Sequence, residues 1–215
     1  MQSPDPKTLI DGAGALGVSL TGDQVHTLLA YLALLSKWNR VYNLTAVRDP
    51  SAMLVQHLLD SIAVVAPLLR WTGGQPARLL DVGSGAGLPG VVIAALAPEI
   101  DVTCVDAVGK KASFIRQVSG ELALKNLHAV HARVESLASE PFDVIVSRAF
   151  ASLVDFVALT RRHPGTGSVW LAMKGLHPAE ELAALPPAID VFHVEQLNVP
   201  GLDAGRCLIW MRERP

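Results

Sequence analysis

Apolar residues recur at helical spacing through roughly the first 75 residues of the chain. Thr21 and Gln24 form a capping-box pattern, which predicts the start of a long helix. Pro50 suits the first turn of another helix, after the loop NRVYNLTAVRD. Each start is followed by an apolar stripe that one face of a helix would bury. The residues of the two stripes are Leu28, Leu29, Leu32, Leu35 and Trp38, then Met53, Leu54, Leu58, Ile62 and Val65.

The periodicity changes after a cluster of helix breakers at residues 71–76. Short apolar runs then alternate with helical patterns, which is typical of βαβ units and a parallel sheet. The predicted strands cover residues 78–82, 101–106, 129–134, 142–147 and 168–173, and the predicted helices cover 88–97, 110–124, 153–162 and 178–185. We therefore divide the chain into a helical extension over residues 1–75 and an α/β core over residues 76–215.

The last two strand-like runs, residues 191–199 and 206–212, are separated only by residues 200–205. This connection is too short for a helical crossover, so the two strands are predicted to pair antiparallel. The expected fold is α/β and Rossmann-like, with five parallel strands and an antiparallel C-terminal hairpin.

Composition indicates a globular domain, because half of the 215 residues are apolar and only 18% are charged. No apolar run reaches the ~18 residues of a membrane span, and the N-terminus lacks the pattern of a signal peptide. Cys104 and Cys207 form no C-x-x-C, and the seven histidines show no metal-binding spacing. We expect a cytoplasmic monomer without metal. The net charge of −2 neither favours nor excludes a nucleic-acid partner.

Residues 79–90, LLDVGSGAGLPG, place four glycines where a strand meets a helix. Gly83, Gly85 and Gly87 form G-x-G-x-G, whereas Gly85, Gly87 and Gly90 form the G-x-G-x-x-G of dinucleotide-binding folds. Both templates bring backbone N–H groups to a ligand. Both also expect an acid at the end of the next strand to bind ribose hydroxyls, and Asp106 lies there.

Two features favour S-adenosylmethionine over a nicotinamide dinucleotide as the ligand of this loop. Asp81, two residues before Gly83, suits a cationic amino-acid group and would repel a pyrophosphate. The chain also has a single nucleotide-binding half, followed by a hairpin that nicotinamide-binding folds do not require. An NAD-dependent dehydrogenase and a non-catalytic RNA-binding module remain the alternatives. The expected cofactor contacts are Asp81, Gly83, Gly85, Gly87 and Asp106.

Basic residues lie near the ends of several predicted strands, and one begins the last strand, at the edge where an α/β sheet binds its ligand. They are Lys110, Lys111, Arg133, Arg148, Lys174 and Arg206. This placement is that of phosphate contacts around a shared site, although solvated loop charges are the alternative for each residue. Phe150 is a candidate to stack on an extruded base or to pack in the core. His57, Asp60 and Ser61 contain the letters of a catalytic triad, but we expect a capped, solvated helix face there.

The glycine loop, with TCVDAVGKKASFIRQV after it, resembles class I S-adenosylmethionine-dependent methyltransferases. FDVIVSRAFASL, AMKG at 172–175 and WNRVYNLTAVRDP resemble one family specifically, the bacterial small-subunit ribosomal RNA (guanine-N7) methyltransferases formerly called glucose-inhibited division protein B. The resemblance runs from about Tyr31 to Arg206. It implies methylation of a guanine in the 530 loop of 16S rRNA.

The resemblance also implies roles for individual residues. It puts Gly83, Leu88, Val134, Glu135 and Arg148 at cofactor-contacting positions, and it favours RNA contact for Arg133, Arg148, Lys174 and Arg206. We expect Arg148 to be catalytic.

The residues after the fourth strand indicate which kind of atom accepts the methyl group. Ser147-Arg148-Ala149-Phe150 lacks the Asn/Asp-Pro-Pro-aromatic turn used for exocyclic amines. Neither cysteine is placed to attack a pyrimidine carbon. A ring nitrogen such as guanine N7 needs neither device, because its lone pair is free at neutral pH.

Overall fold

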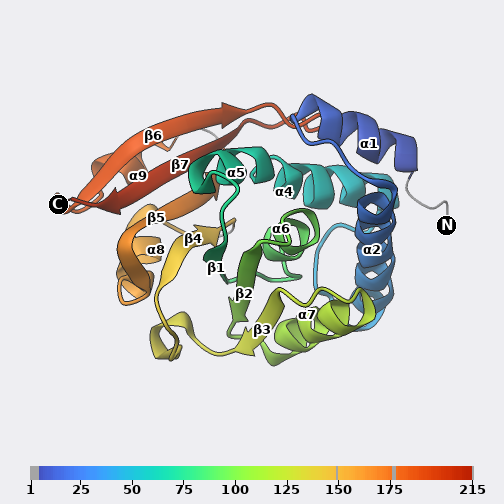
Figure 1. The fold of residues 1–215 in the computed structure, drawn as a ribbon, viewed down its shortest axis with the longest axis horizontal. Helices are drawn as coiled ribbons and strands as arrows, with labels where there is room; N and C mark the ends of the chain where they lie inside the picture. The colour runs from blue at the N-terminus through green and yellow to red at the C-terminus, as the bar shows by residue number, and fades with distance from the viewer. Residues whose placement is uncertain (1–4, 149, 176–177, 215) are drawn as a thin grey trace.

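A computed structural model describes residues 5–148, 150–175 and 178–214, and it contains a seven-stranded mixed sheet (Figure 1). The strand order is β3-β2-β1-β4-β5-β7-β6, in which β1 to β5 run parallel and β7 is antiparallel to both of its neighbours. The strands are β1 (Ala77–Val82), β2 (Ile100–Asp106), β3 (Leu127–His131), β4 (Phe142–Ser147), β5 (Pro164–Lys174), β6 (Ile189–Leu197) and β7 (Arg206–Glu213). This arrangement confirms the predicted Rossmann-like fold and its terminal hairpin.

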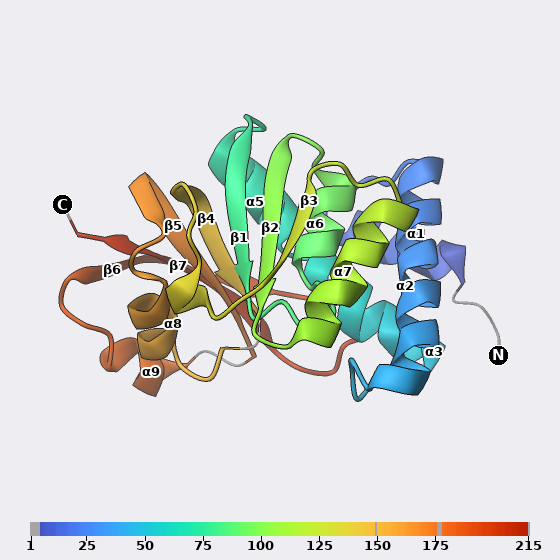
Figure 2. The same ribbon diagram turned by 90° about the horizontal axis from the view of Figure 1, so that it is seen from below.

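The parallel strands are mainly apolar, as expected for a sheet that helices cover on both faces. Alternate residues of each strand enter two separate hydrophobic clusters, so Leu79 joins one and Leu80 the other. Helices α2 (Gly22–Tyr42), α6 (Gly90–Leu96) and α7 (Gly109–Glu121) lie together on one side, whereas α8 (Leu153–Thr160) and α9 (Ala179–Ala183) lie toward the hairpin (Figure 2). The pattern of two-sided burial therefore follows from the period-2 alternation of strand side chains.

Residues 50–72 form one helical stretch with a change of pitch inside it. It consists of α3 (Pro50–Met53), the π-helical turn η1 (Leu54–Leu59), α4 (Asp60–Ile62) and α5 (Val65–Thr72). The stretch is long and apolar enough to span a membrane by composition, but 72% of its most apolar window is buried inside this protein. It is a core helix that packs against the sheet.

The predicted helix starts are confirmed by their caps. The Thr21 side chain accepts from the Gln24 N–H, and the Gln24 side chain accepts from the Thr21 N–H. Asp49 caps the helix that starts at Pro50. The predicted third strand, residues 129–134, starts two residues and ends three residues later than β3, because Val134 belongs to the 3₁₀ turn η2 (Val134–Ser136).

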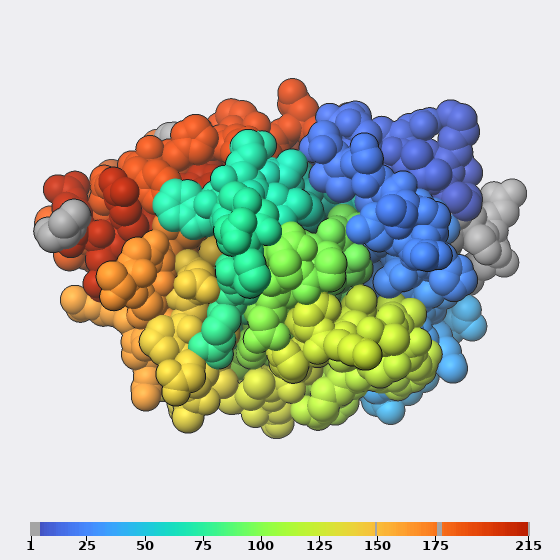
Figure 3. Space-filling model, in the orientation of Figure 1, coloured from blue at the N-terminus to red at the C-terminus, as the bar shows by residue number. Residues whose placement is uncertain are grey.

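The N-terminal helices share one hydrophobic cluster with the α/β core. Leu28 and Tyr31 of α2 belong to the same cluster as Val91 of α6 and Phe114 of α7. Helix α1 (Pro6–Ala15) packs against η1, and Figure 3 shows these helices in close contact with the rest of the surface. The division at residue 75 stays a prediction, and the two parts are joined by shared burial.

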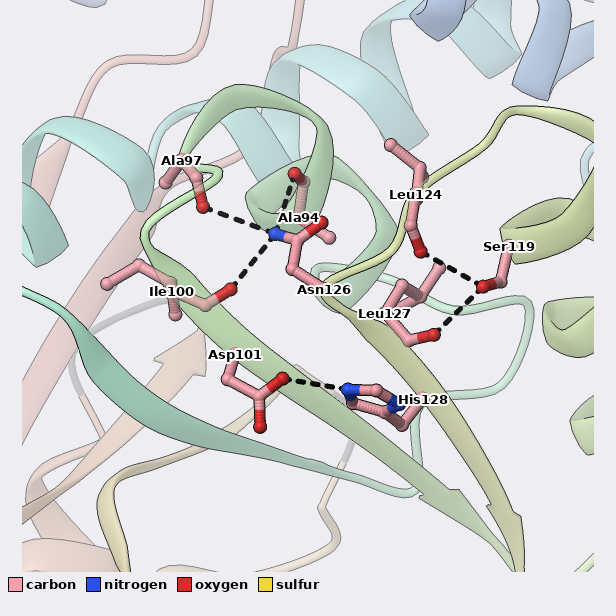
Figure 4. Close-up of polar contacts among 9 residues, drawn as sticks. All are labelled: Ala94, Ala97, Ile100, Asp101, Ser119, Leu124, Asn126, Leu127 and His128. Carbon is pink, nitrogen blue, oxygen red and sulfur yellow. Dashed lines mark hydrogen bonds and ion pairs between the residues drawn. The ribbon is translucent and has the colours of Figure 1, made fainter.

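Polar side chains tie the loops together where the parallel strands begin. The Asn126 amide donates to the carbonyls of Ala94, Ala97 and Ile100 at 3.1, 3.4 and 3.0 Å (Figure 4). His128 and Asp101 lie 2.7 Å apart on neighbouring strands. These contacts fix the edge of the sheet that is opposite the glycine loop.

Candidate active site

The glycine loop lies between the carboxyl end of β1 and the start of α6. Gly83, Gly85 and Gly87 all have positive φ, at +65°, +61° and +89°. Residues with a Cβ adopt this region only at a cost. The space where a Cβ of Gly83 would lie is open, so the backbone at this position can approach a ligand closely.

Gly87 and Gly90 have a packing role instead. A Cβ on Gly90 would lie 2.4 Å from Cys104 Sγ and 2.8 Å from Asp81 Oδ2. A Cβ on Gly87 would lie 2.5 Å from Val91 Cγ2. These glycines bring α6 against β1 and β2, and Gly90 is therefore a packing glycine.

Asp81 lies beneath the loop and is completely buried. Its Oδ2 accepts a 2.8 Å hydrogen bond from the Gly90 N–H, whereas its Oδ1 has no partner. Burial raises the pKa of this carboxyl from 3.8 to about 7, and the Gly90 hydrogen bond and nearby Arg148 partly oppose that shift. An unpartnered buried carboxylate oxygen under a glycine loop fits a cationic ligand group.

A cavity of about 230 Å³ opens beside the loop, and we call it the loop cavity. Asp106 lies in its wall, and its two oxygens accept from the N–H groups of Gly85 and Val108 at 2.9 and 2.8 Å. Each carboxylate oxygen has a further lone pair for a hydroxyl donor. The remaining lining residues are Val82, Gly83, Val105, Ala107, Ala132, Arg133, Val134, Glu135, Phe150 and Leu159.

A second cavity, of about 360 Å³, lies at the ends of β4 and β5, and we call it the arginine cavity. Its lining contains three of the cations that were predicted to lie at this edge of the sheet. Arg148 follows β4, Lys174 ends β5 and Arg206 begins β7. The sheet order reverses between β1 and β4, and ligands of open α/β sheets bind at such a switch point. The remaining lining residues are Gln56, His57, Asp60, Met173 and Gly175.

Asp60 holds two of these cations in place. Its Oδ1 accepts from Arg206 Nε at 2.8 Å, and its Oδ2 lies 3.3 Å from Arg148 Nη1. Arg148 Nη1 also donates to the Gln56 carbonyl at 3.0 Å. Asp60 is 3% exposed, so its charge is offset by guanidinium groups and not by water.

Gln56 and His57 of the π-helical turn line the arginine cavity together with Asp60, the first residue of α4. Turns of this type are frequent at functional sites because they reorient side chains within a helix. His57 Nε2 lies 3.0 Å from Thr45 Oγ1, and Nδ1 has no partner. Burial, followed by nearby Arg148, lowers the pKa of His57 from 6.5 to about 4, so the ring is neutral at pH 7.

The expectation of a solvated face at His57, Asp60 and Ser61 was therefore wrong, because all three residues are buried. Apolar residues surround them on every side of the helix, from Met53 to Val65. A helix that is apolar all round is buried, and polar residues within it are then functional candidates. Asp60 and His57 could have been found by that signal.

The structure does not bring all predicted RNA contacts together. Arg133 lines the loop cavity and lies apart from Arg148 and Arg206. Lys174 Nζ pairs with Glu181 at 2.8 Å and donates to the Phe150 carbonyl, so part of its charge is offset. Phe150 lines the loop cavity and packs on Phe156, with ring centroids 5.4 Å apart. Ala149 of the predicted turn lies outside the described residues.

The remaining predicted residues also have defined places. Leu88 is buried in the core beside the loop. Lys111 Nζ lies 3.6 Å from Asp106, and Lys110 is exposed at the start of α7. Cys104 and Cys207 are both buried. Across the residues that the structure describes, no group of three His, Cys, Asp or Glu side chains could hold a metal ion.

Three comparisons with known proteins agree with this geometry. The chain is 63% identical to ribosomal RNA small subunit methyltransferase G of Leptothrix cholodnii over 211 residues, which is 98% of this chain and 97% of the relative. A SAM-dependent methyltransferase from Aquifex aeolicus matches 76% of this chain, and 93% of its own, at 18% identity and a TM-score of 0.54. The Burkholderia thailandensis 1,6-didemethyltoxoflavin-N1-methyltransferase, solved with S-adenosylhomocysteine, matches 86% of this chain and 90% of its own at 16% identity and a TM-score of 0.56.

The two solved structures share the fold with this chain at low sequence identity, and both are methyltransferases. The sequence profile of a whole family, rRNA small subunit methyltransferase G, matches residues 24–209. That match spans the glycine loop and all residues that line both cavities. The chain therefore belongs to the rRNA small subunit methyltransferase G family and is a methyltransferase.

Proposed function

We propose that this enzyme methylates N7 of a guanine in the 530 loop of 16S rRNA, with S-adenosylmethionine as methyl donor. The observation that carries the proposal is the pair of adjoining cavities at the switch point of the sheet, one beside the glycine loop and one lined by cations. The name of the 63% identical relative supports small-subunit rRNA as the substrate. The motif resemblance supports the guanine and its N7.

The residues around the loop cavity fit the proposed cofactor. Asp81 Oδ1 is a buried acceptor without a partner, which suits the positively charged amino-acid part. Asp106 offers carboxylate lone pairs to ribose hydroxyls, and the open backbone at Gly83 allows close approach. Val134 and Glu135 lie in the cavity wall, where an adenine ring would pack. The bound cofactor would supply an electrophilic methyl group on a sulfonium.

The arginine cavity suits the acceptor. Methyl transfer to a free lone pair requires alignment and electrostatic accommodation, and no proton has to be removed before the attack. Arg148 and Arg206 present cations fixed by Asp60, which suit guanine O6 and phosphate oxygens. We propose that Arg148 orients the base and that Arg206 and Lys174 contact the RNA backbone. No side chain is required as a general base.

The enzyme is proposed to act as a monomer, and its proposed substrate places it in the bacterial cytoplasm. The decisive experiment supplies labelled S-adenosylmethionine to 30S subunits and to naked 16S rRNA, both lacking the modification. Nucleoside mass spectrometry should detect 7-methylguanosine in at least one of them. Absence of 7-methylguanosine from both substrates would refute the proposed function.

A further inference from the structure

We infer that the end of α2 and the loop after it form a second RNA-binding surface, which holds single-stranded nucleotides flanking the target base. We call it the α2-end surface and define it by Arg40, Tyr42 and Arg48. The inference rests on the proposed function, since it concerns how the same substrate is held.

An aromatic row leads from the core to this surface. Tyr31 and Phe114 are fully buried and lie 6.2 Å apart. Trp38 packs on Phe114 at 5.4 Å, and Tyr42 packs on Trp38 at 4.9 Å. Tyr42 is 42% exposed, so the row ends in a ring that the layers beneath it support. A supported, exposed aromatic ring is the platform on which proteins stack unpaired bases.

Cations lie close to Tyr42 along the chain. Arg40 and Arg48 line a cavity of about 180 Å³ together with Ser36, Asn39 and Met53. Residues 36–53 carry three cations, Lys37, Arg40 and Arg48, and one acid, Asp49, whereas the whole chain has a net charge of −2. The Asp49 carboxylate accepts from the Ala52 N–H and caps the helix. The local excess of positive charge favours a polyanion as the partner.

The loop is held in one conformation by its own polar contacts. Asn43 ends α2 in the left-handed region, and its side chain accepts from Arg48 Nη2 at 2.8 Å. Asn39 Oδ1 accepts from the Thr45 N–H at 2.9 Å. A surface that is ordered before binding loses less entropy on binding.

The same loop touches the arginine cavity. Thr45 Oγ1 lies 3.0 Å from His57 Nε2, and His57 lines that cavity. In Figure 2, the end of α2 lies beside α3, which begins the helical stretch that carries His57 and Asp60. A strand of RNA whose base enters the arginine cavity can therefore continue onto the α2-end surface.

The test removes the aromatic ring and the two arginines separately. Tyr42→Ala should raise the KM for naked 16S rRNA about tenfold and weaken its retention on filters equally, whereas kcat should change less than twofold. Tyr42→Phe should restore the affinity, because the stacking face is kept. Arg40→Gln/Arg48→Gln should weaken binding and flatten its salt dependence.

The matched control is Lys125→Gln/Arg161→Gln, which removes the same charge where strands β3 and β5 begin, at the opposite edge of the sheet. It should leave rRNA affinity unchanged. S-adenosylhomocysteine affinity and the unfolding midpoint report whether each variant is folded.

Unchanged rRNA affinity in a folded Tyr42→Ala protein would overturn the inference. Weaker binding to 30S subunits alone, with naked rRNA bound normally, would assign the surface to a ribosomal protein and would also overturn it. Filter retention is measured without turnover. Absence of methylation in the wild type therefore refutes the proposed function without deciding this inference.

Discussion

The two cavities of the active site are built in different ways. The loop cavity is shaped by the backbone, through three glycines with positive φ and a fourth that allows α6 to touch β2. The arginine cavity is shaped by side chains from four distant segments, and one buried carboxylate, Asp60, holds Arg148 and Arg206 together. The loop cavity should therefore be disrupted by substitutions that add a side chain to a glycine. The arginine cavity should be disrupted by substitutions that remove a charged group.

The largest effect is expected from Gly90→Ala in the loop. The added methyl would meet Cys104 and Asp81 in the core, so the free energy of unfolding should fall by about 3 kcal/mol. Gly83→Ala is the control, because its Cβ meets open space and only the positive φ costs about 1 kcal/mol. Urea unfolding midpoints compare the two, and equal midpoints would contradict a packing role for Gly90.

Arg148 lines the arginine cavity and not the loop cavity, so Arg148→Ala should disrupt the arginine cavity alone, contrary to the cofactor contact that the resemblance implies for this residue. We expect kcat to fall about 100-fold, or ~2.7 kcal/mol, while S-adenosylhomocysteine affinity stays within threefold. Steady-state methyl transfer and isothermal titration measure the two quantities. Arg212→Ala, which removes an arginine paired with Asp190 on the hairpin, should keep full activity. Near wild-type activity of Arg148→Ala would remove this residue from the site.

The stability of the helix beside the arginine cavity should depend on pH through His57. Its pKa is lowered from 6.5 to about 4, so its stabilising contribution is present above pH 6.5 and is lost as the pH falls toward 4. From pH 7 to pH 4.5, the wild type should lose roughly 2 kcal/mol more than His57→Gln. Urea titrations at both pH values measure the difference. The same loss in both proteins would show that His57 is not buried in its neutral form.

Asp60→Asn should produce the smallest of these effects. The variant keeps an acceptor oxygen for one arginine but removes the charge that orients both, so kcat/KM should fall about tenfold, or ~1.4 kcal/mol. Cofactor affinity should not change. Asp190→Asn, which breaks the ion pair to Arg212, serves as the control. A loss of cofactor affinity in Asp60→Asn would show that the two cavities are not separate.

The sequence predicted the backbone-built region far better than the side-chain-built one. The strand, the glycines and Asp106 are close along the chain, so spacing alone located the loop cavity. The partners in the arginine cavity are far apart along the chain. Arg148 and Lys174 were found because parallel strands end at one edge, and Arg206 because it begins the last strand. Asp60 was missed, since its ion pairs depend on how a helix 146 residues from Arg206 packs on the sheet.

The change of pitch in η1 could not be predicted either. Residues 54–59 have an ordinary helical pattern, and Leu54, Leu58 and Leu59 are buried in the π-helical turn. The spacing of Gln56, His57 and Asp60 puts them on one face of a helix, but it does not show that this face lines a cavity.

The position of the methyl group on the RNA tests the central claim most directly. Reduction and aniline cleavage at 7-methylguanosine, followed by primer extension, maps each modified guanine in 16S rRNA. The comparison uses unmodified 30S subunits that are treated with either the wild type or Arg148→Ala. We predict one stop within the 530 loop for the wild type and none for Arg148→Ala. A stop at another position, or an equal stop with Arg148→Ala, would contradict the account.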